Sequence, residues 1–263
     1  MDHTYWRRQE AGKPLFPDIE WNRPEQKTQA GRLAIIGGNK LGFAAVATAY
    51  DDADKTGAGQ IRAVLPDGLK KVIPPSILGT VYVPMTVSGG ISKDGIPELV
   101  AAAEWADVTL LIGDNGRNPE TAIGLEAVML RSARPLVITR DAFDSLRPVS
   151  QQLVDRERTT LVVSFAQLQK LFQTVYYPKI LSFSMQLQQL VEALHKFTVT
   201  YPVTIVTFHQ SQLVIAHDGQ VITQDFYEPM MIWRGSVATK AACYLMWNPS
   251  KPLEAIAASV TQI

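Results

Sequence analysis

The feature that most constrains the fold is an alternation of short apolar segments with longer segments of helical periodicity. Short apolar runs that end in glycine or proline are typical of strands buried on both faces of a sheet. They predict strands over 32–38, 60–66, 80–85, 108–113, 135–139, 160–164 and 202–209, and a hairpin over 212–223 that turns at Asp218-Gly219. Apolar residues at helical spacing predict helices over 43–59, 96–105, 119–132 and 183–197, and two more from about Gly235 and from about Pro252.

Strands that alternate with helices predict an α/β fold, a three-layer α/β/α sandwich with a mostly parallel central sheet. Residues 1–30 are polar and carry three prolines, so we expect an N-terminal arm laid over a single domain of residues 31–263. Ligands of such folds bind at the carboxyl ends of the strands, where helix N-termini converge. Site residues are therefore expected in the segments that follow the strands.

Composition excludes several classes of function. The 263 residues include 25 Lys plus Arg and 25 Asp plus Glu, so no net charge attracts nucleic acid or an anionic membrane, and neither partner is expected. No segment approaches the roughly 20 apolar residues of a membrane span. Cys243 is the only cysteine and lies in an apolar run, which predicts a buried thiol, no internal disulfide and a cytoplasmic location.

Two glycine-containing loops follow predicted strands. In IIGGNKLG, Gly37 and Gly38 let the backbone approach a phosphate, with Asn39 and Lys40 as further contacts. A tight turn from strand to helix explains these glycines equally well. The pattern is neither the Rossmann fingerprint nor the P-loop.

The second loop, GDNGRNPET, offers Asp114, Asn115 and Arg117 as polar ligand contacts. A solvated loop followed by a capped helix is the competing interpretation. No histidine or cysteine spacing typical of a metal site occurs, so no metal-binding residues are predicted.

Acidic residues follow the next strand in TRDAFDSL. A carboxylate such as Asp141 or Asp144 at the end of a strand can hold a metal or a ribose. Asp141 is equally suited to cap the helix that follows, and that interpretation is favoured.

The segment IWRGSVATK opens a helix with Gly235. Free N–H groups and the helix dipole favour an anion there, with Arg234 adding positive charge and Ser236 bonding a phosphate oxygen or capping the helix. A plain helix start is the alternative.

In this order, the segments resemble the NAD(P)H-hydrate dehydratase family of the ribokinase-like fold. The resemblance is carried by 22–66, which closes its helix in Thr56-Gly57-Ala58-Gly59, by ADVTLLIGDNGRNPET, by PLVITRDAFDSL and by KPLEAIAASV. It implies ATP or ADP, Mg²⁺ and an NAD(P)H-type ligand over the carboxyl ends of the strands, and a homo-oligomer. The nucleotide-binding residues would be Arg234, Gly235, Ser236, Asn115 and Gly116. The substrate-binding residues would be Gly37, Gly38, Asn39, Lys40 and Asp141.

The chain departs from the family where the chemistry is done. Ser236 stands in place of the Asp expected to act as base, Thr139 replaces the first Asp of the family's D-A-D segment, and Thr207-Phe208 replaces a nucleotide-holding Lys-Gly. The segment VVSFAQ (162–167) has lost the His, Gly and Glu of the family motif. This pattern favours a divergent, nucleotide-binding relative with weak or no catalysis.

Two alternatives stay open. The first is an active hydro-lyase or small-molecule kinase in which Asp141, Asp114 or Glu228 replaces the lost base. The second is a structural subunit of an oligomer, with the aromatic and apolar stretch 172–185 lining the interface, although burial in the protomer core explains that stretch equally well.

Overall fold

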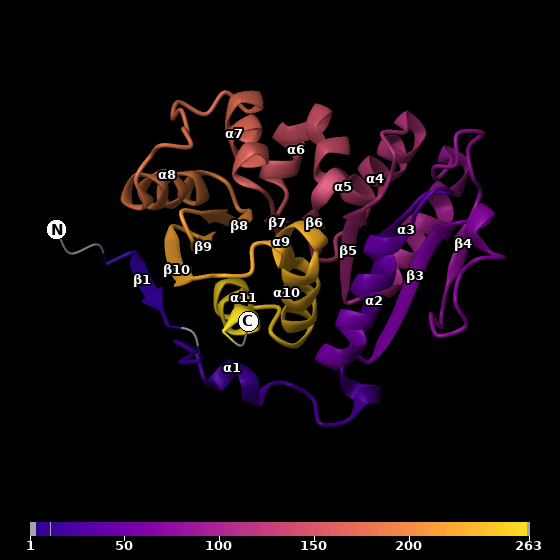
Figure 1. Cartoon of the computed structure of the whole chain (residues 1–263), viewed down its shortest axis with the longest axis horizontal. Helices are drawn as coiled ribbons and strands as arrows, with labels where there is room; N and C mark the ends of the chain where they lie inside the picture. Colours follow the sequence, from indigo (N-terminus) through magenta and orange to yellow (C-terminus); the bar gives the residue numbers. More distant parts are fainter. Residues whose placement is uncertain (1–3, 11, 262–263) are drawn as a thin grey trace.

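A central sheet runs through the computed structural model, which describes residues 4–10 and 12–261 (Figure 1). Its strand order is β1-β10-β9-β8-β7-β6-β5-β2-β3-β4. The strands are β1 (Trp6–Gln9), β2 (Arg32–Gly37), β3 (Gln60–Pro66), β4 (Val81–Val83), β5 (Val108–Gly113), β6 (Leu136–Thr139), β7 (Thr159–Val162), β8 (Thr204–His209), β9 (Gln212–His217) and β10 (Gln220–Asp225).

Most neighbouring strands are parallel, and β9 alone runs antiparallel to the strands on both of its sides. From β2 the chain builds the sheet outward through β3 to β4, whereas from β5 it builds the opposite way, through β6 and β7 to β8. The strand order therefore reverses between β2 and β5. Such a switch point is where open α/β sheets usually bind their ligands.

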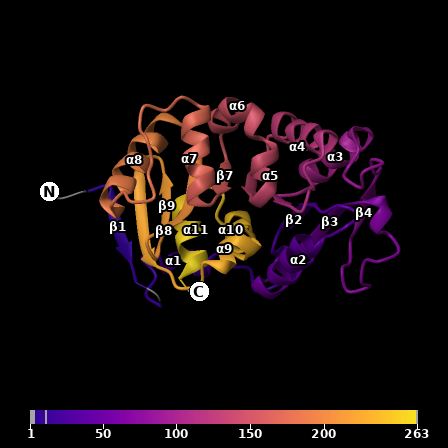
Figure 2. The same cartoon turned by 45° about the horizontal axis from the view of Figure 1, so that its top comes forward.

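Helices cover both faces of the sheet, as Figures 1 and 2 show. The helices are α1 (Asp18–Trp21), α2 (Ala44–Thr56), α3 (Ile96–Trp105), α4 (Pro119–Arg131), α5 (Arg140–Ser145), α6 (Ser150–Asp155), α7 (Phe165–Thr174), α8 (Leu187–Thr200), α9 (Met230–Arg234), α10 (Ser236–Trp247) and α11 (Pro252–Val260). Helices α3 to α8 enclose one apolar core, and α2, α10 and α11 enclose the other. Successive strand residues alternate between the two cores: Leu110 and Ile112 face one, and Leu111 faces the other.

This architecture confirms the predicted fold class. The hairpin turn is also confirmed, because Asp218 (φ 45°) and Gly219 (φ 69°) both take the positive φ of a tight hairpin turn. The helix predicted over 183–197 begins later, at Leu187, so that prediction is wrong at its start. Gln186 and Gln189 form a capping box there. Phe183, expected on the buried face, precedes the helix and is 65% exposed.

The aromatic stretch 172–185 is divided between core and surface. Phe172, Leu181 and Met185 are buried, whereas Tyr176 and Ile180 are exposed. Its role in an oligomer stays a prediction.

The first 30 residues contribute a strand to the sheet. β1 pairs in parallel with β10, and the buried Gln9 side chain donates hydrogen bonds to Gln224 Oε1 (2.7 Å) and to the Ala257 carbonyl (2.8 Å). The division into an arm and a single domain stays a prediction. Among residues 4–10 and 12–261, no helix is long and apolar enough to cross a membrane.

Candidate functional site

At the switch point, the carboxyl ends of β2 and β5 lie in close contact with each other. A Cβ atom added to Gly37 would lie 2.4 Å from the Gly113 carbonyl oxygen, and Gly38 donates its N–H to that same oxygen at 2.7 Å. Only glycine allows this approach at position 37. Of the two interpretations of the Gly-Gly pair, the close turn from strand to helix is therefore the one that these contacts account for.

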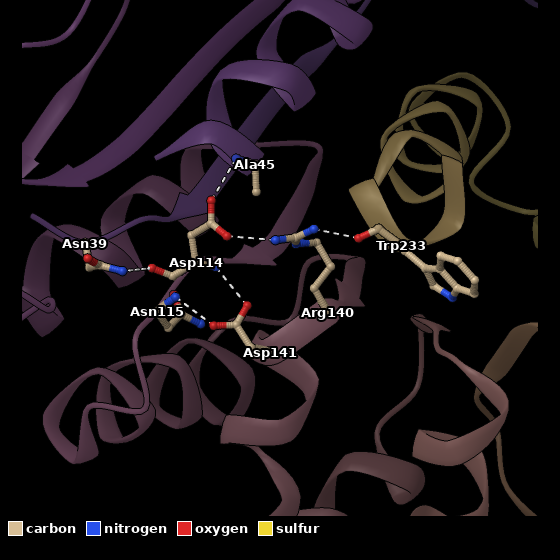
Figure 3. A network of polar contacts seen from close by, with 7 residues as sticks. All are labelled: Asn39, Ala45, Asp114, Asn115, Arg140, Asp141 and Trp233. Atoms are coloured by element: carbon tan, nitrogen blue, oxygen red, sulfur yellow. Dashed lines mark hydrogen bonds and ion pairs between the residues drawn. The ribbon is translucent and has the colours of Figure 1, made fainter. Parts of the chain in front are cut away.

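Asn39 and Lys40 are held by neighbouring loops. The Asn39 side chain donates to the Asp114 carbonyl and accepts from Leu41 N (2.7 Å), and the Lys40 N–H donates to the Gly89 carbonyl (2.7 Å). Asn39 thus joins the loop after β2 to the loop after β5 (Figure 3). Contact with a substrate stays a prediction for Gly37, Gly38, Asn39 and Lys40.

The loop after β5 forms a cradle for an anion, and a protein carboxylate fills it. Gly113 (φ 105°) and Asp114 (φ 59°) turn the backbone so that successive N–H groups point the same way. Asp114 N donates to Asp141 Oδ1 and Asn115 N to Asp141 Oδ2, each at 2.8 Å (Figure 3). Asp141 therefore binds this loop, and its predicted role as the cap of its own helix is wrong. The N-cap of α5 is Thr139, without a side-chain capping bond.

Asp114 fills a second anion position, at the start of α2. Its Oδ2 accepts from the Ala45 N–H at 2.8 Å, and the cap residue of α2, Phe43, supplies no side-chain acceptor. Its Oδ1 forms an ion pair with Arg140 Nη2 at 2.7 Å. A helix N-terminus favours a negative charge, and here the chain supplies that charge itself.

The region at the carboxyl ends of β2, β5 and β6 is here called the mouth. Arg140 links the Asp114 carboxylate to α9 on the opposite side of this mouth. It lies directly after β6, adopts a left-handed conformation (φ 56°), and donates from Nη1 to the Trp233 carbonyl in α9 at 2.5 Å (Figure 3). Sequence reasoning did not single it out. The available signal was an arginine immediately after a strand and immediately before the selected Asp141.

The helix start at Gly235 is packed against these groups. Gly235 (φ 96°) ends α9 and begins α10, and a Cβ atom on it would meet Ile112 at 2.7 Å and Arg140 Cδ at 3.5 Å. Gly235 is buried and Ser236 is only 8% exposed, whereas Arg234 is exposed. Ser236 is the first helical residue and Gly235 holds the cap position, so Ser236 does not cap the helix. The dipole of α10 still favours an anion at its start, but Ile112 and Arg140 pack closely against Gly235 there.

Open space lies beside this mouth, in two adjoining pockets. The first, here called the α9 pocket, has a volume of about 510 Å³ and is lined by residues that include Val162, Gln167, Ile232 and Trp233. The second, the α4 pocket, has a volume of about 540 Å³. Its lining includes Arg117, Asn118, Arg147 and Pro119. Asp141, Asp144 and Lys170 line both pockets, so the two adjoin at these side chains, and neither lining includes Gly235, Ser236, Asn115 or Gly116.

The described residues offer no preformed metal site. No group of three or more His, Cys, Asp or Glu side chains in this part of the chain is placed to hold an ion. Both oxygens of Asp114 and both of Asp141 already accept hydrogen bonds or ion pairs, and Asp144 accepts from Gln167 at 2.9 Å. Within the described part of the chain, Asp144 accepts on Oδ2 alone, which leaves its Oδ1 as the one oxygen of these three carboxylates without a hydrogen bond, and one oxygen does not fit a protein-held Mg²⁺.

The chain is similar in sequence to known proteins over part of its length. No protein-family model matches the chain. A bifunctional NAD(P)H-hydrate repair enzyme of Moorella thermoacetica is 27% identical over 118 residues, which are 44% of this chain and 22% of that enzyme. The corresponding enzyme of Salinibacter ruber is 26% identical over 141 residues, which are 52% of this chain and 26% of that one. The chain thus spans about a quarter of the length of the curated relatives it matches.

Solved structures match over nearly the whole chain. A ribokinase-like superfamily protein of Enterococcus faecalis has a TM-score of 0.73 at 16% identity, covering 100% of this chain and 88% of that one. The ADP/ATP-dependent NAD(P)H-hydrate dehydratase of Bacillus subtilis, crystallised with ATP and Mg²⁺, has a TM-score of 0.63 at 14% identity and covers 94% of this chain and 86% of that one.

The class of protein is therefore defined by its fold, which is ribokinase-like. Within that class, the chain resembles NAD(P)H-hydrate dehydratases in sequence, over about half its length, and diverges from them.

Proposed function

We propose that this chain is a divergent NAD(P)H-hydrate dehydratase-like protein that binds a nucleotide in the joined α9 and α4 pockets, with weak or no catalysis. The names of its relatives and the ATP in the Bacillus subtilis neighbour support the choice of ligand class. Trp233 and Ile232 give the α9 pocket an apolar wall suited to a base or nicotinamide ring. ATP, ADP and an NAD(P)H-type dinucleotide are the candidate ligands.

The observation that carries the proposal is the engagement of the carboxylates around the mouth. Phosphoryl transfer needs a base near the attacking hydroxyl, and a positioned base contributes about 10²- to 10⁴-fold. Ser236 has no carboxylate, Asp114 is held by Ala45 and Arg140, and Asp141 is held by two backbone N–H groups. Glu228 is exposed and does not line either pocket.

Two measurements on the full chain test this function together. Thermal unfolding with millimolar ADP, ATP, NADH or hydrated NADH, each with Mg²⁺, reports binding, because a ligand bound only by the native state raises the melting temperature. Absorbance at 340 nm, with hydrated NADH and either ATP or ADP, reports repair. A related active dehydratase is the positive control.

We expect a rise in melting temperature with at least one nucleotide and no rise in absorbance above the uncatalysed rate. Turnover comparable to the positive control would overturn the proposal and favour the active enzyme with a relocated base. A melting temperature unmoved by every nucleotide would also overturn it and favour the structural subunit.

A further inference from the structure

The three backbone positions described above that could hold an anion are filled or covered by the chain itself. The cradle in the loop after β5 holds the Asp141 carboxylate, and the start of α2 holds the Asp114 carboxylate. The start of α10 is buried against Ile112 and Arg140. A phosphate at any of these positions would have to displace a group that already makes hydrogen bonds or packs closely.

The α4 pocket, in contrast, is lined by three positive and two negative side chains. Arg117, Arg147 and Lys170 line it, and within residues 4–10 and 12–261 none of the three forms an ion pair. The facing carboxylates are those of Asp141, which two N–H groups hold, and Asp144, which accepts from Gln167.

The start of helix α4 supports the same position. Its N-cap Asn118 and first residue Pro119 line the pocket, so the positive end of the helix dipole lies there. Asn118 Oδ1 accepts from the Thr121 N–H, so the helix supplies its dipole and not a free cradle. Arg117, Arg147 and Lys170 come from three different elements, the loop after β5, the turn after α5, and α7.

We propose that the α4 pocket is the phosphate subsite of this chain, and that Arg117, Arg147 and Lys170 bind the pyrophosphate group of a nucleotide or dinucleotide. The inference rests on the proposed function and adds the position of the phosphates. The two pockets adjoin at Asp141, Asp144 and Lys170, and in this arrangement the ligand would place its ring against Trp233 in the α9 pocket and its phosphates in the α4 pocket. Arginine suits this role because its planar fork binds phosphate oxygens in pairs.

Titration calorimetry with inorganic pyrophosphate, ADP and adenosine tests the subsite. The test variants are Arg147→Gln and Lys170→Gln, and we expect each to weaken pyrophosphate and ADP binding by about threefold to tenfold, the effect of removing one partly exposed charge. The double variant is expected to lose more than tenfold. Adenosine, which lacks phosphate, is expected to respond little to either change.

A further variant controls for the loss of charge. Lys251→Gln removes an exposed lysine just beyond the far end of α10 and serves as the matched charge control, with no expected change.

The outcomes separate this inference from the proposed function. ADP binding that is unaffected by Arg147→Gln, Lys170→Gln and the double variant would overturn the subsite and leave nucleotide binding intact. Pyrophosphate binding without any binding of nucleotides would support the subsite and overturn the proposed function. Absence of all binding would overturn both.

Discussion

The ion pair between Arg140 and Asp114 should be a measurable part of the stability of this protein. Its side chains are 27% and 21% exposed, between the surface pairs that contribute about 0.2–1 kcal/mol and the buried pairs whose disruption costs about 3–5 kcal/mol. Arg140→Met removes this pair and the hydrogen bond to the Trp233 carbonyl. We expect a loss of about 2–3 kcal/mol in the free energy of unfolding, or roughly 5–10 °C in melting temperature.

A double-mutant cycle isolates the pair. Asp114→Asn removes the charge but keeps an oxygen that can accept from Ala45, and Asn tolerates the positive φ (59°) of this position. Urea unfolding, followed by circular dichroism and by tryptophan fluorescence, gives the four free energies. We expect a coupling of about 1–2 kcal/mol, weaker in 1 M salt. A coupling below about 0.3 kcal/mol would refute the reasoning, because the two side chains would then act independently.

Three other predictions follow from close contacts and burial. Gly37→Ala should destabilise the fold by about 2 kcal/mol or more, because its new Cβ would meet the Gly113 carbonyl oxygen, whereas Gly42→Ala, which has nothing within 4 Å, should be nearly neutral in the same denaturation assay. Burial raises the pKa of the Cys243 thiol to about 12, so the native protein should resist alkylation at pH 8 and react only when unfolded; rapid native labelling would contradict this. Burial lowers the pKa of His217 from its ordinary 6.5, so its contribution to the free energy of unfolding is present above pH 6.5 and lost below it. His217→Asn should therefore reduce the loss of unfolding free energy between pH 6.5 and lower pH. A variant whose free energy of unfolding falls with pH as steeply as that of the wild type would count against this prediction.

Much of the fold is visible in the sequence because local patterns carry it. The strand runs end in glycine or proline, and the alternation of Leu110, Leu111 and Ile112 between two cores requires helices on both faces. Helix α7 had a usable local signal that was interpreted otherwise. Ser164 and Gln167 form a capping box, and this segment was considered only as a degenerate family motif.

The site is less predictable because its contacts join distant parts of the chain. Asp114 and Asp141 were selected from the sequence, but as ligand contacts or a cap, whereas their partners are Ala45, Arg140 and the loop after β5. Arg140 reaches a carbonyl 93 residues away. Such pairings depend on the strand order of the sheet, which no local pattern specifies.

The central claim is that the carboxylates around the mouth are engaged within the protein and therefore do not take part in phosphoryl transfer. A crystal structure of the chain with ATP and Mg²⁺ tests it most directly. We expect the Asp114–Arg140 pair to stay intact, the phosphates to lie against Arg147 and Lys170, and no carboxylate within about 4 Å of the terminal phosphate. A structure in which Asp114 or another carboxylate has moved to within that distance of the terminal phosphate would contradict the account.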